Sequence, residues 1–233
     1  MGHGNYIDPF QEENRFLADA RNDNAVRGVG DSVILRRAEP DVRIYTVGAG
    51  ETLDLVLTSF PGENTQRDID IDIVGEGAHV NLSGLYLCTG DERVRFTVRL
   101  HHRVPGCVSY QLFKGIVAGT AQVRFDGRII VAPDAQKTEA YQENHNLLLS
   151  ETAVVDTLPQ LEIYADDVKC SHGATVGRLN EDEQFYMRSR GIPEAEARIL
   201  QMLSFLSPVI DKVADPEERE ALRVRVESAV RGL

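Results

Sequence analysis

Between residues 32 and 179, apolar and polar residues alternate along short segments that turn residues separate. The clearest segments are Asp54–Thr58, Asp68–Ile73 and Arg93–Val98, in which Asp, Arg or Thr is interleaved with Leu, Ile, Val or Phe. A period of two residues is typical of a β-strand with one buried face. Turn signals recur about every 8 to 12 residues, a spacing that favours an all-β architecture. We therefore predict a β-rich core at 32–179.

A weak internal repeat runs through this region. Segments that begin at Ala78, Ala121 and Ala153 superimpose without gaps, and each runs into an acidic turn. Their starts lie 43 and 32 residues apart, both near multiples of roughly 11 residues, as expected if about two strands make one coil of a solenoid. An ordinary β-sandwich has equally short strands, so the pattern by itself leaves both architectures open.

From residue 180 the period changes to that of amphipathic helices. Asn180 followed by Glu183 is a capping-box start, and Gly191 marks the end of this first helix. Its apolar face is predicted to consist of Phe185, Tyr186 and Met187.

Two further helices are predicted. One opens at Pro193 and is expected to kink or end at Pro208. Its apolar stripe consists of Ala197, Leu200, Leu203 and Leu206. The last helix opens at 215–218, and its apolar positions are Leu222, Val226 and Val230. The chain thus divides into a polar N-terminal tail (1–31), a β-core (32–179) and a C-terminal helical domain (180–233).

Composition narrows the classes of function. Lys and Arg number 25 against 37 Asp and Glu, and the net charge of -12 argues against nucleic acid and anionic membranes as partners. The three cysteines, Cys88, Cys107 and Cys170, show no CxxC spacing, which disfavours a disulfide scaffold or a zinc ribbon. The first 28 residues lack the apolar core of a signal peptide, and no apolar run could span a bilayer. We expect a soluble, cytoplasmic protein.

Few residue patterns carry chemistry. The chain has no phosphate-binding loop, no GxSxG elbow and no HExxH motif, so we do not expect an enzyme that acts alone. His101 and His102 are adjacent in a strand, where their side chains point to opposite faces, and a structural role is the better interpretation. Cys170 and His172 instead share a face, and a thiolate beside an imidazole suits iron or another transition metal. Two ligands do not complete a site, so a buried cysteine beside a hydrogen-bonded histidine remains the alternative.

Several longer segments stand out, one of them around this pair: DDVKCSHGATVG (166–177), AQKT (135–138), NHNLLLS (144–150), PQLEI (159–163) and FYMRSRGI (185–192). Together they resemble the C-terminal signature of the SufB/SufD family. The resemblance is close over about residues 95 to 205 and looser from about residue 45. The form CSHGA looks more like the SufD branch than SufB.

This resemblance implies a right-handed parallel β-helix (β-solenoid) followed by a small C-terminal α-helical domain. Family members are non-ATPase subunits of an iron–sulfur cluster assembly complex, in which the β-helices pair and the C-terminal helices dock the ABC-type ATPase SufC. Carried over to this chain, Cys170 and His172 are the candidate cluster, metal or interface residues. The candidate docking residues are Phe185, Tyr186, Arg188, Arg190, Gly191 and Ile192, together with the helix after Pro193.

The resemblance also implies partners and a cargo. The partners would be a SufC-like ATPase and either a SufB-like subunit or a second copy of this chain, and an iron–sulfur cluster would be bound transiently, with none held stably. The chain departs from the family in lacking the helical N-terminal domain and in carrying Pro208 where the family continues a helix, so a compact homodimer is one expectation. A purely structural adaptor for the ATPase is the alternative. A carbohydrate enzyme on a β-helix is a third reading, for which the sequence offers no catalytic cluster.

Overall fold

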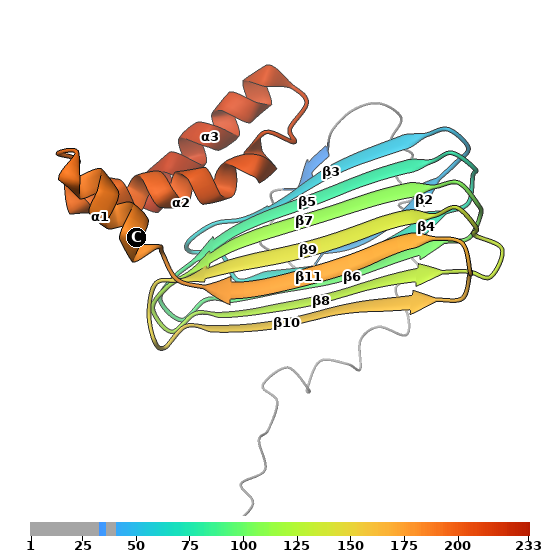
Figure 1. Ribbon diagram of the computed structural model, residues 1–233, viewed down its shortest axis with the longest axis horizontal. Coiled ribbons are helices and arrows are strands. Elements are labelled where there is room, and N and C mark those ends of the chain that lie inside the picture. The colour runs from blue at the N-terminus through green and yellow to red at the C-terminus, as the bar shows by residue number, and fades with distance from the viewer. Residues whose placement is uncertain (1–32, 36–40) are drawn as a thin grey trace, which may run out of the picture.

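The structure, a computed structural model, describes residues 33–35 and 41–233, and the predicted tail at 1–31 lies outside these residues. Its strands form two sheets (Figure 1). The first, called the odd sheet, contains in spatial order β1 (Val33–Leu35), β3 (Thr52–Ser59), β5 (His79–Cys88), β7 (Val108–Val117), β9 (Glu139–Leu148) and β11 (Lys169–Gly177). The second, called the even sheet, contains β10 (Val154–Ile163), β8 (Gln122–Val131), β6 (Arg93–His102), β4 (Thr65–Ile73) and β2 (Asp41–Val47).

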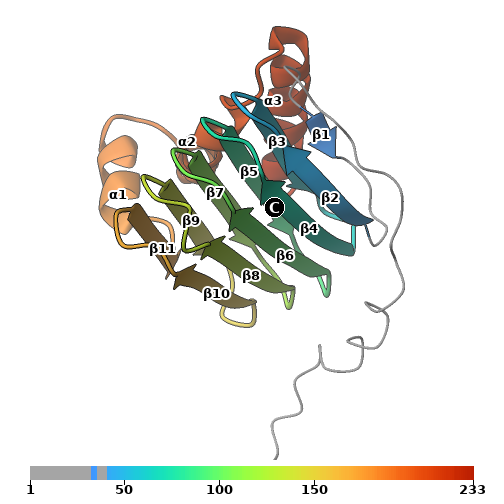
Figure 2. The ribbon, with the colours of Figure 1, turned by 90° about the vertical axis from the view of Figure 1, so that its right-hand side faces the viewer.

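The chain winds as a parallel β-helix. Consecutive strands alternate between the two sheets, which Figure 2 shows as separate layers, and every strand pairing that the structure describes is parallel. Parallel pairing between strands that are not adjacent in the chain confirms the solenoid and excludes the antiparallel sandwich.

One coil is longer than the repeat predicted. Leu55 pairs in register with Leu82 on the odd sheet, and Val123 pairs with Val155 on the even sheet. The step from Ala121 to Ala153 therefore corresponds to one full coil. The step from Ala78 to Ala121 instead leads from the odd sheet to the even sheet, so a repeat unit of about 11 residues was wrong.

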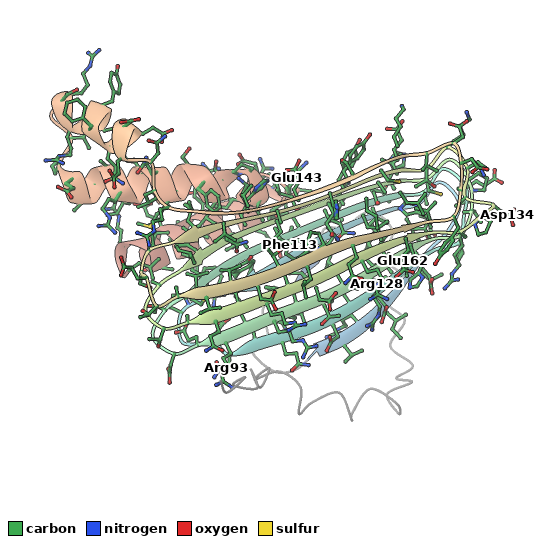
Figure 3. The ribbon with its side chains drawn as sticks, turned by 60° about the horizontal axis from the view of Figure 1, so that its bottom comes forward. Arg93, Phe113, Arg128, Asp134, Glu143 and Glu162 are labelled. Carbon is green, nitrogen blue, oxygen red and sulfur yellow. The ribbon has the colours of Figure 1, made fainter. Side chains whose placement is uncertain are left out.

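The inward face of the odd sheet is largely apolar in β3 and β5 and becomes polar in β9. Residues at alternate positions of β3 to β9 are buried between the sheets. Among them are four aromatic side chains whose rings pack in a row, Tyr86, Phe96, Phe113 and Phe125, and Phe113 is labelled in Figure 3. In β9 the inward positions include Gln142, Asn144 and Asn146, all of which are buried.

The charged residues that alternate with apolar ones in the even-sheet strands lie on the outer face of that sheet, where they form ion pairs. Arg99 Nε of β6 lies 2.7 Å from Asp70 Oδ1 of β4, and Arg128 Nη1 of β8 lies 3.3 Å from Glu162 Oε1 of β10. Arg128 and Glu162 are labelled in Figure 3. Because these pairs are partly exposed, each contributes only about 0–1 kcal/mol. They favour one register between coils more than they add to overall stability.

Three helices follow in the described region: α1 (Glu181–Ser189), α2 (Glu194–Ile210) and α3 (Pro216–Arg231). Asn180 accepts hydrogen bonds from the N–H groups of Asp182 and Glu183 at the start of α1, as predicted. At its end Gly191 has a φ of 88°, and Ile192 N–H donates to Met187 O, which is a Schellman cap. None of the helices in the described part of the chain is long and apolar enough to cross a membrane.

Helices α2 and α3 cover one end of the outer face of the odd sheet. Their apolar side chains form a second core with Leu85, Leu87 and Ile116 of β5 and β7. The predicted inward positions of α3 are confirmed, because Leu222, Val226 and Val230 are all buried.

The predictions for α1 and α2 need three corrections. The stripe of α2 is rotated, since Ala197 and Leu206 are buried but Leu200 is 40% exposed. Of the two outcomes predicted at Pro208, a kink or an end, the end is wrong, because helix α2 continues to Ile210. Proline leaves the carbonyl four residues earlier without its helical donor, and the Ser207 hydroxyl donates to that carbonyl, Ser204 O, at 3.0 Å. Finally, the described helix α1 contains no buried residue, so its apolar face does not join the core.

Candidate functional site

The last coil of the β-helix, which we call the end coil, consists of β10 and β11. Within the described residues β10 pairs only with β8 and β11 pairs only with β9, so each leaves one backbone edge unpaired. The end coil is also open on its inward face, where Ile163 is 41% exposed and Val176 is 46% exposed. An unpaired edge next to exposed apolar side chains is a surface that another chain can cover.

Cys170 and His172 lie on the inward face of this end coil. Cys170 pairs in register with Ala140 and His172 pairs with Gln142, and both of these β9 residues are buried between the sheets. Cys170 is half-buried and packs with the end-coil cluster around Leu161, whereas His172 is exposed. The spacing correctly predicted that the thiol and the imidazole share a face.

Burial keeps the Cys170 thiol protonated in the isolated chain. Burial raises the pKa of Cys170 above its ordinary value, and a hydrogen bond from the Ala140 backbone opposes this only in part. Across residues 33–35 and 41–233, no group of three or more His, Cys, Asp and Glu side chains is placed to hold a metal ion. Cys170 and His172 therefore supply at most half of a tetrahedral site, and a thiol becomes a good metal ligand only once it loses its proton.

The other histidines and cysteines have structural surroundings. His102 is fully buried, with Nε2 2.9 Å from Ser109 Oγ, and the neighbouring His101 lies half-buried on the opposite face, as predicted. Cys107 is also buried in the core. His145 lies on the outer face of the odd sheet, with Nδ1 2.8 Å from Thr175 Oγ1 and Nε2 3.2 Å from Glu143 Oε2.

A column of polar side chains beneath the end coil was missed from the sequence. Gln142 Nε2 donates to Gln111 Oε1 at 2.9 Å, and both side chains are buried. Gln142 lies directly beneath His172 in register, and Gln111 lies beneath Gln142. The available signal was parity, because Gln142, Asn144 and Asn146 are polar residues spaced by two along a predicted strand.

The candidate docking residues lie on and after α1. Phe185 is 72% exposed and Tyr186 is 59% exposed. The Arg190 guanidinium lies 5.3 Å from the centre of the Tyr186 ring, and Arg188 forms an ion pair with Glu194 at 3.5 Å. Gly191 and Ile192 form the cap described above, so they set the direction in which the chain leaves α1.

A groove of about 720 Å³ separates α1 from α2. Its apolar lining comes from Leu147, Leu179, Tyr186, Met187, Leu200 and Phe205. The lining also includes the acidic residues Asp182 and Glu183 and the basic residue Arg178. Leu200, whose exposure the helical pattern did not predict, lines this groove.

Several known proteins are similar in sequence to this chain. A family model described as SUF system FeS cluster assembly, SufBD core domain, matches residues 41–205. The chain is 39% identical over 165 residues to the iron–sulfur cluster assembly protein SufD of Escherichia coli strain K12, which covers 71% of this chain and 39% of that protein. It is 32% identical over 164 residues to SufD of Bacillus subtilis strain 168, with 70% and 35% covered. It is 37% identical over 178 residues to the chloroplastic protein ABCI7 of Arabidopsis thaliana, with 74% and 37% covered. The chain thus spans less than half the length of these relatives.

Proposed function

The chain belongs to the family of iron–sulfur cluster assembly proteins that share the SufBD core domain, and on that premise we propose that it is a non-catalytic scaffold subunit of a SUF-type assembly complex. The observation that carries the proposal is the position of Cys170 and His172. A soft sulfur ligand and an imidazole lie on the same inward face of an open end coil. In this role the cluster is cargo, and the remaining ligands come from a second chain.

The end coil is the proposed pairing surface. Its two unpaired backbone edges can accept strands from another β-helix, and its inward apolar residues Leu161, Ile163 and Val176 would be covered at the same time. The partner is a SufB-like subunit or a second copy of this chain. Pairing would place the partner's ligands opposite Cys170 and His172 and would exclude water from the site.

The groove between α1 and α2 is the proposed docking surface for a SufC-like ABC ATPase. Phe185 and Tyr186 are aromatic side chains with most of their area exposed, and such residues often anchor interfaces. Helix α1 buries none of its own described side chains, so a partner that covers it would supply much of its packing. ATP hydrolysis would belong to that partner.

Cluster assembly is tested by anaerobic reconstitution with iron and sulfide in the presence of the SufB-like partner, read out by visible absorption. Cys170→Ala and His172→Ala should each lower the cluster yield several-fold. Ser171→Ala, which changes the opposite face of the same strand, is the matched control and should not alter the yield. Equal yields in all four proteins would remove Cys170 and His172 from this role.

Docking is tested by co-purification with the ATPase. Replacing Phe185 and Tyr186 together by alanine should weaken retention of the ATPase at least tenfold, because both exposed aromatic anchors are lost. Val224→Ala is the control, since Val224 is a 59% exposed apolar residue of α3 outside the groove. Undiminished retention by the double variant would place the ATPase elsewhere.

A structural adaptor that docks the ATPase without holding a cluster is the second candidate function. The observation that favours it is the raised pKa of the Cys170 thiol, which keeps a candidate ligand protonated. The two experiments separate the functions, because an adaptor would lose ATPase retention in the Phe185 and Tyr186 variant and show no cluster in any protein.

We further propose that this work takes place in the cytoplasm. Cys88, Cys107 and Cys170 are all free thiols, and two of them are buried. Unpaired cysteines fit a reducing compartment, where disulfides seldom form. Thiol labelling of Cys170 in intact cells checks this point, since oxidation of Cys170 there would argue against a reducing location.

A further inference from the structure

We propose that Gln142 is a positioning residue for His172. In this proposal Gln142 Oε1 accepts a hydrogen bond from one ring nitrogen of His172 and thereby directs the other ring nitrogen out of the end coil, toward a ligand or group on a partner. The inference rests on the proposed role of His172 and names what orients its ring.

The orientation of the Gln142 amide follows from its neighbour below. Gln142 Nε2 donates to Gln111 Oε1 at 2.9 Å, which directs the amide nitrogen down the column and leaves Oε1 for the coil above. Gln142 is 0% exposed, and its Oε1 is a buried oxygen without a hydrogen-bond partner among the described residues. A buried amide oxygen left without a donor costs about 1–3 kcal/mol. A donor from the next coil would remove that cost.

The absence of a side chain at Gly127 leaves room for the Gln142 amide. Gly127 faces the interior from β8, and a Cβ at this position would lie 2.6 Å from Gln142 Nε2. The glycine therefore makes room for the glutamine side chain between the sheets. In the next coil Pro159 pairs with Gly127 and His172 pairs with Gln142. The proline side chain carries no hydrogen-bond donor, so the imidazole is the donor that the register places directly over the amide.

The Thr157 hydroxyl is the competing donor. It lies on β10 at the register of Phe125, and its Oγ1 is also buried without a partner among the described residues. The register favours His172, because His172 is the direct Cα partner of Gln142, whereas Thr157 belongs to the opposite sheet.

An acceptor on one ring nitrogen has a defined chemical effect. A neutral imidazole carries its proton on either Nδ1 or Nε2, and an acceptor beside one nitrogen favours the tautomer that carries the proton there. The other nitrogen then presents its lone pair, which is how acceptors behind histidine ligands orient them in metal sites. The ladder that continues from Gln111 through Gln142 would thus select both the tautomer and the direction of the His172 ring.

The test uses the full chain labelled with ¹⁵N-histidine and contains no iron, with the His172 signals assigned from a His172→Asn variant. Long-range proton–nitrogen spectra give the tautomer ratio of His172. We expect one tautomer to predominate in the unmodified protein and the ratio to move at least threefold toward that of free histidine in Gln142→Met. Gln111→Met removes the acceptor that orients the Gln142 amide, so it should move the ratio in the same direction by a smaller amount. Thr157→Val removes the competing donor and should match the unmodified protein.

Three results would overturn the proposal: a His172 ratio equal to that of free histidine in the unmodified protein, an unchanged ratio in Gln142→Met, or a shift in Thr157→Val as large as that in Gln142→Met. The first is measured on the unmodified protein, so it does not depend on whether a variant folds. Gln142→Glu supplies a stronger acceptor and should keep the preferred tautomer. No cluster takes part in this experiment, so a failed reconstitution would count against the cluster proposal and not against the tautomer result. A His172 ring without a preferred tautomer would count against the role of Gln142 and not against the cluster yields.

Discussion

Replacing Tyr86 by phenylalanine removes one oxygen atom from a closed ring of three hydrogen bonds in the β-helix interior. The Tyr86 hydroxyl donates to Asn146 Oδ1 at 2.5 Å, Asn146 Nδ2 donates to Asn144 Oδ1 at 2.6 Å, and Asn144 Nδ2 donates back to the hydroxyl at 3.0 Å. All three side chains are at most 2% exposed. The substitution therefore leaves one buried donor, Asn144 Nδ2, and one buried acceptor, Asn146 Oδ1, without their partners.

Each such orphaned group costs about 1–3 kcal/mol. The phenyl ring keeps the contact of Tyr86 with Phe96, whose ring centre lies 5.5 Å away, so loss of apolar packing adds little. We expect Tyr86→Phe to lower the free energy of unfolding by about 3 kcal/mol. For a chain of this size that corresponds to a melting temperature lower by about 10 °C.

Urea denaturation followed by circular dichroism measures the change. Tyr110→Phe is the matched control, since it makes the same chemical change on the outer face of the odd sheet, where Tyr110 is 47% exposed and stacks on Tyr141. Exposed sites of this kind usually change stability by no more than about 0.5 kcal/mol. A loss below about 1 kcal/mol in Tyr86→Phe would refute the reasoning, because the ring would then not be the closed, water-free network described.

Three further predictions concern the core and α1. Burial lowers the pKa of His102 to about 4, below the unfolded value of about 6.5. The contribution of neutral His102 to stability is therefore complete above pH 6.5 and falls by roughly 3 kcal/mol as the pH falls toward 4. In His102→Gln the urea unfolding midpoint should depend less on pH over this range, and an equal pH dependence in the variant and the unmodified protein would contradict the prediction. Gly115→Ala would place a Cβ 1.8 Å from Tyr86 Cε2, and overpacking of this kind costs about 3 kcal/mol in urea titrations; a cost under about 0.5 kcal/mol would show that the ring can move freely. Asn180→Ala removes the N-cap of α1, worth about 1 kcal/mol, and hydrogen exchange at 181–189 should speed up about fivefold while the core stays protected.

The stacking of the coils could not be read from the chain pattern. Alternation correctly placed the strands, because the parity of polar and apolar residues is a local property. The pairing partner of each strand lies a full coil away in the chain, as Leu55 with Leu82 and Val123 with Val155 illustrate, and neither turns nor parity encode that separation. The repeat between Ala78 and Ala121 consequently equated segments that belong to different sheets.

The candidate site was predictable to a similar extent. The spacing of Cys170 and His172 placed them on one face, and the motifs from residue 135 to 192 led to the family that the comparisons confirm. Whether that face is inward, and whether the coil above it is open, depends on which coil is last. A role for Gln142 could be inferred only from the strand pairing that places it beside His172.

By itself the sequence determined the strand and helix periods, the caps at Asn180 and Gly191, and the family, because each depends on residues close together in the chain. Only the tertiary structure decided which polar residues are enclosed, which apolar residues of α1 and α2 remain exposed, and that the thiol and imidazole lie at an uncovered end. Those properties depend on contacts between segments that are distant in the chain, because a side chain is buried only where a neighbouring coil or helix covers it.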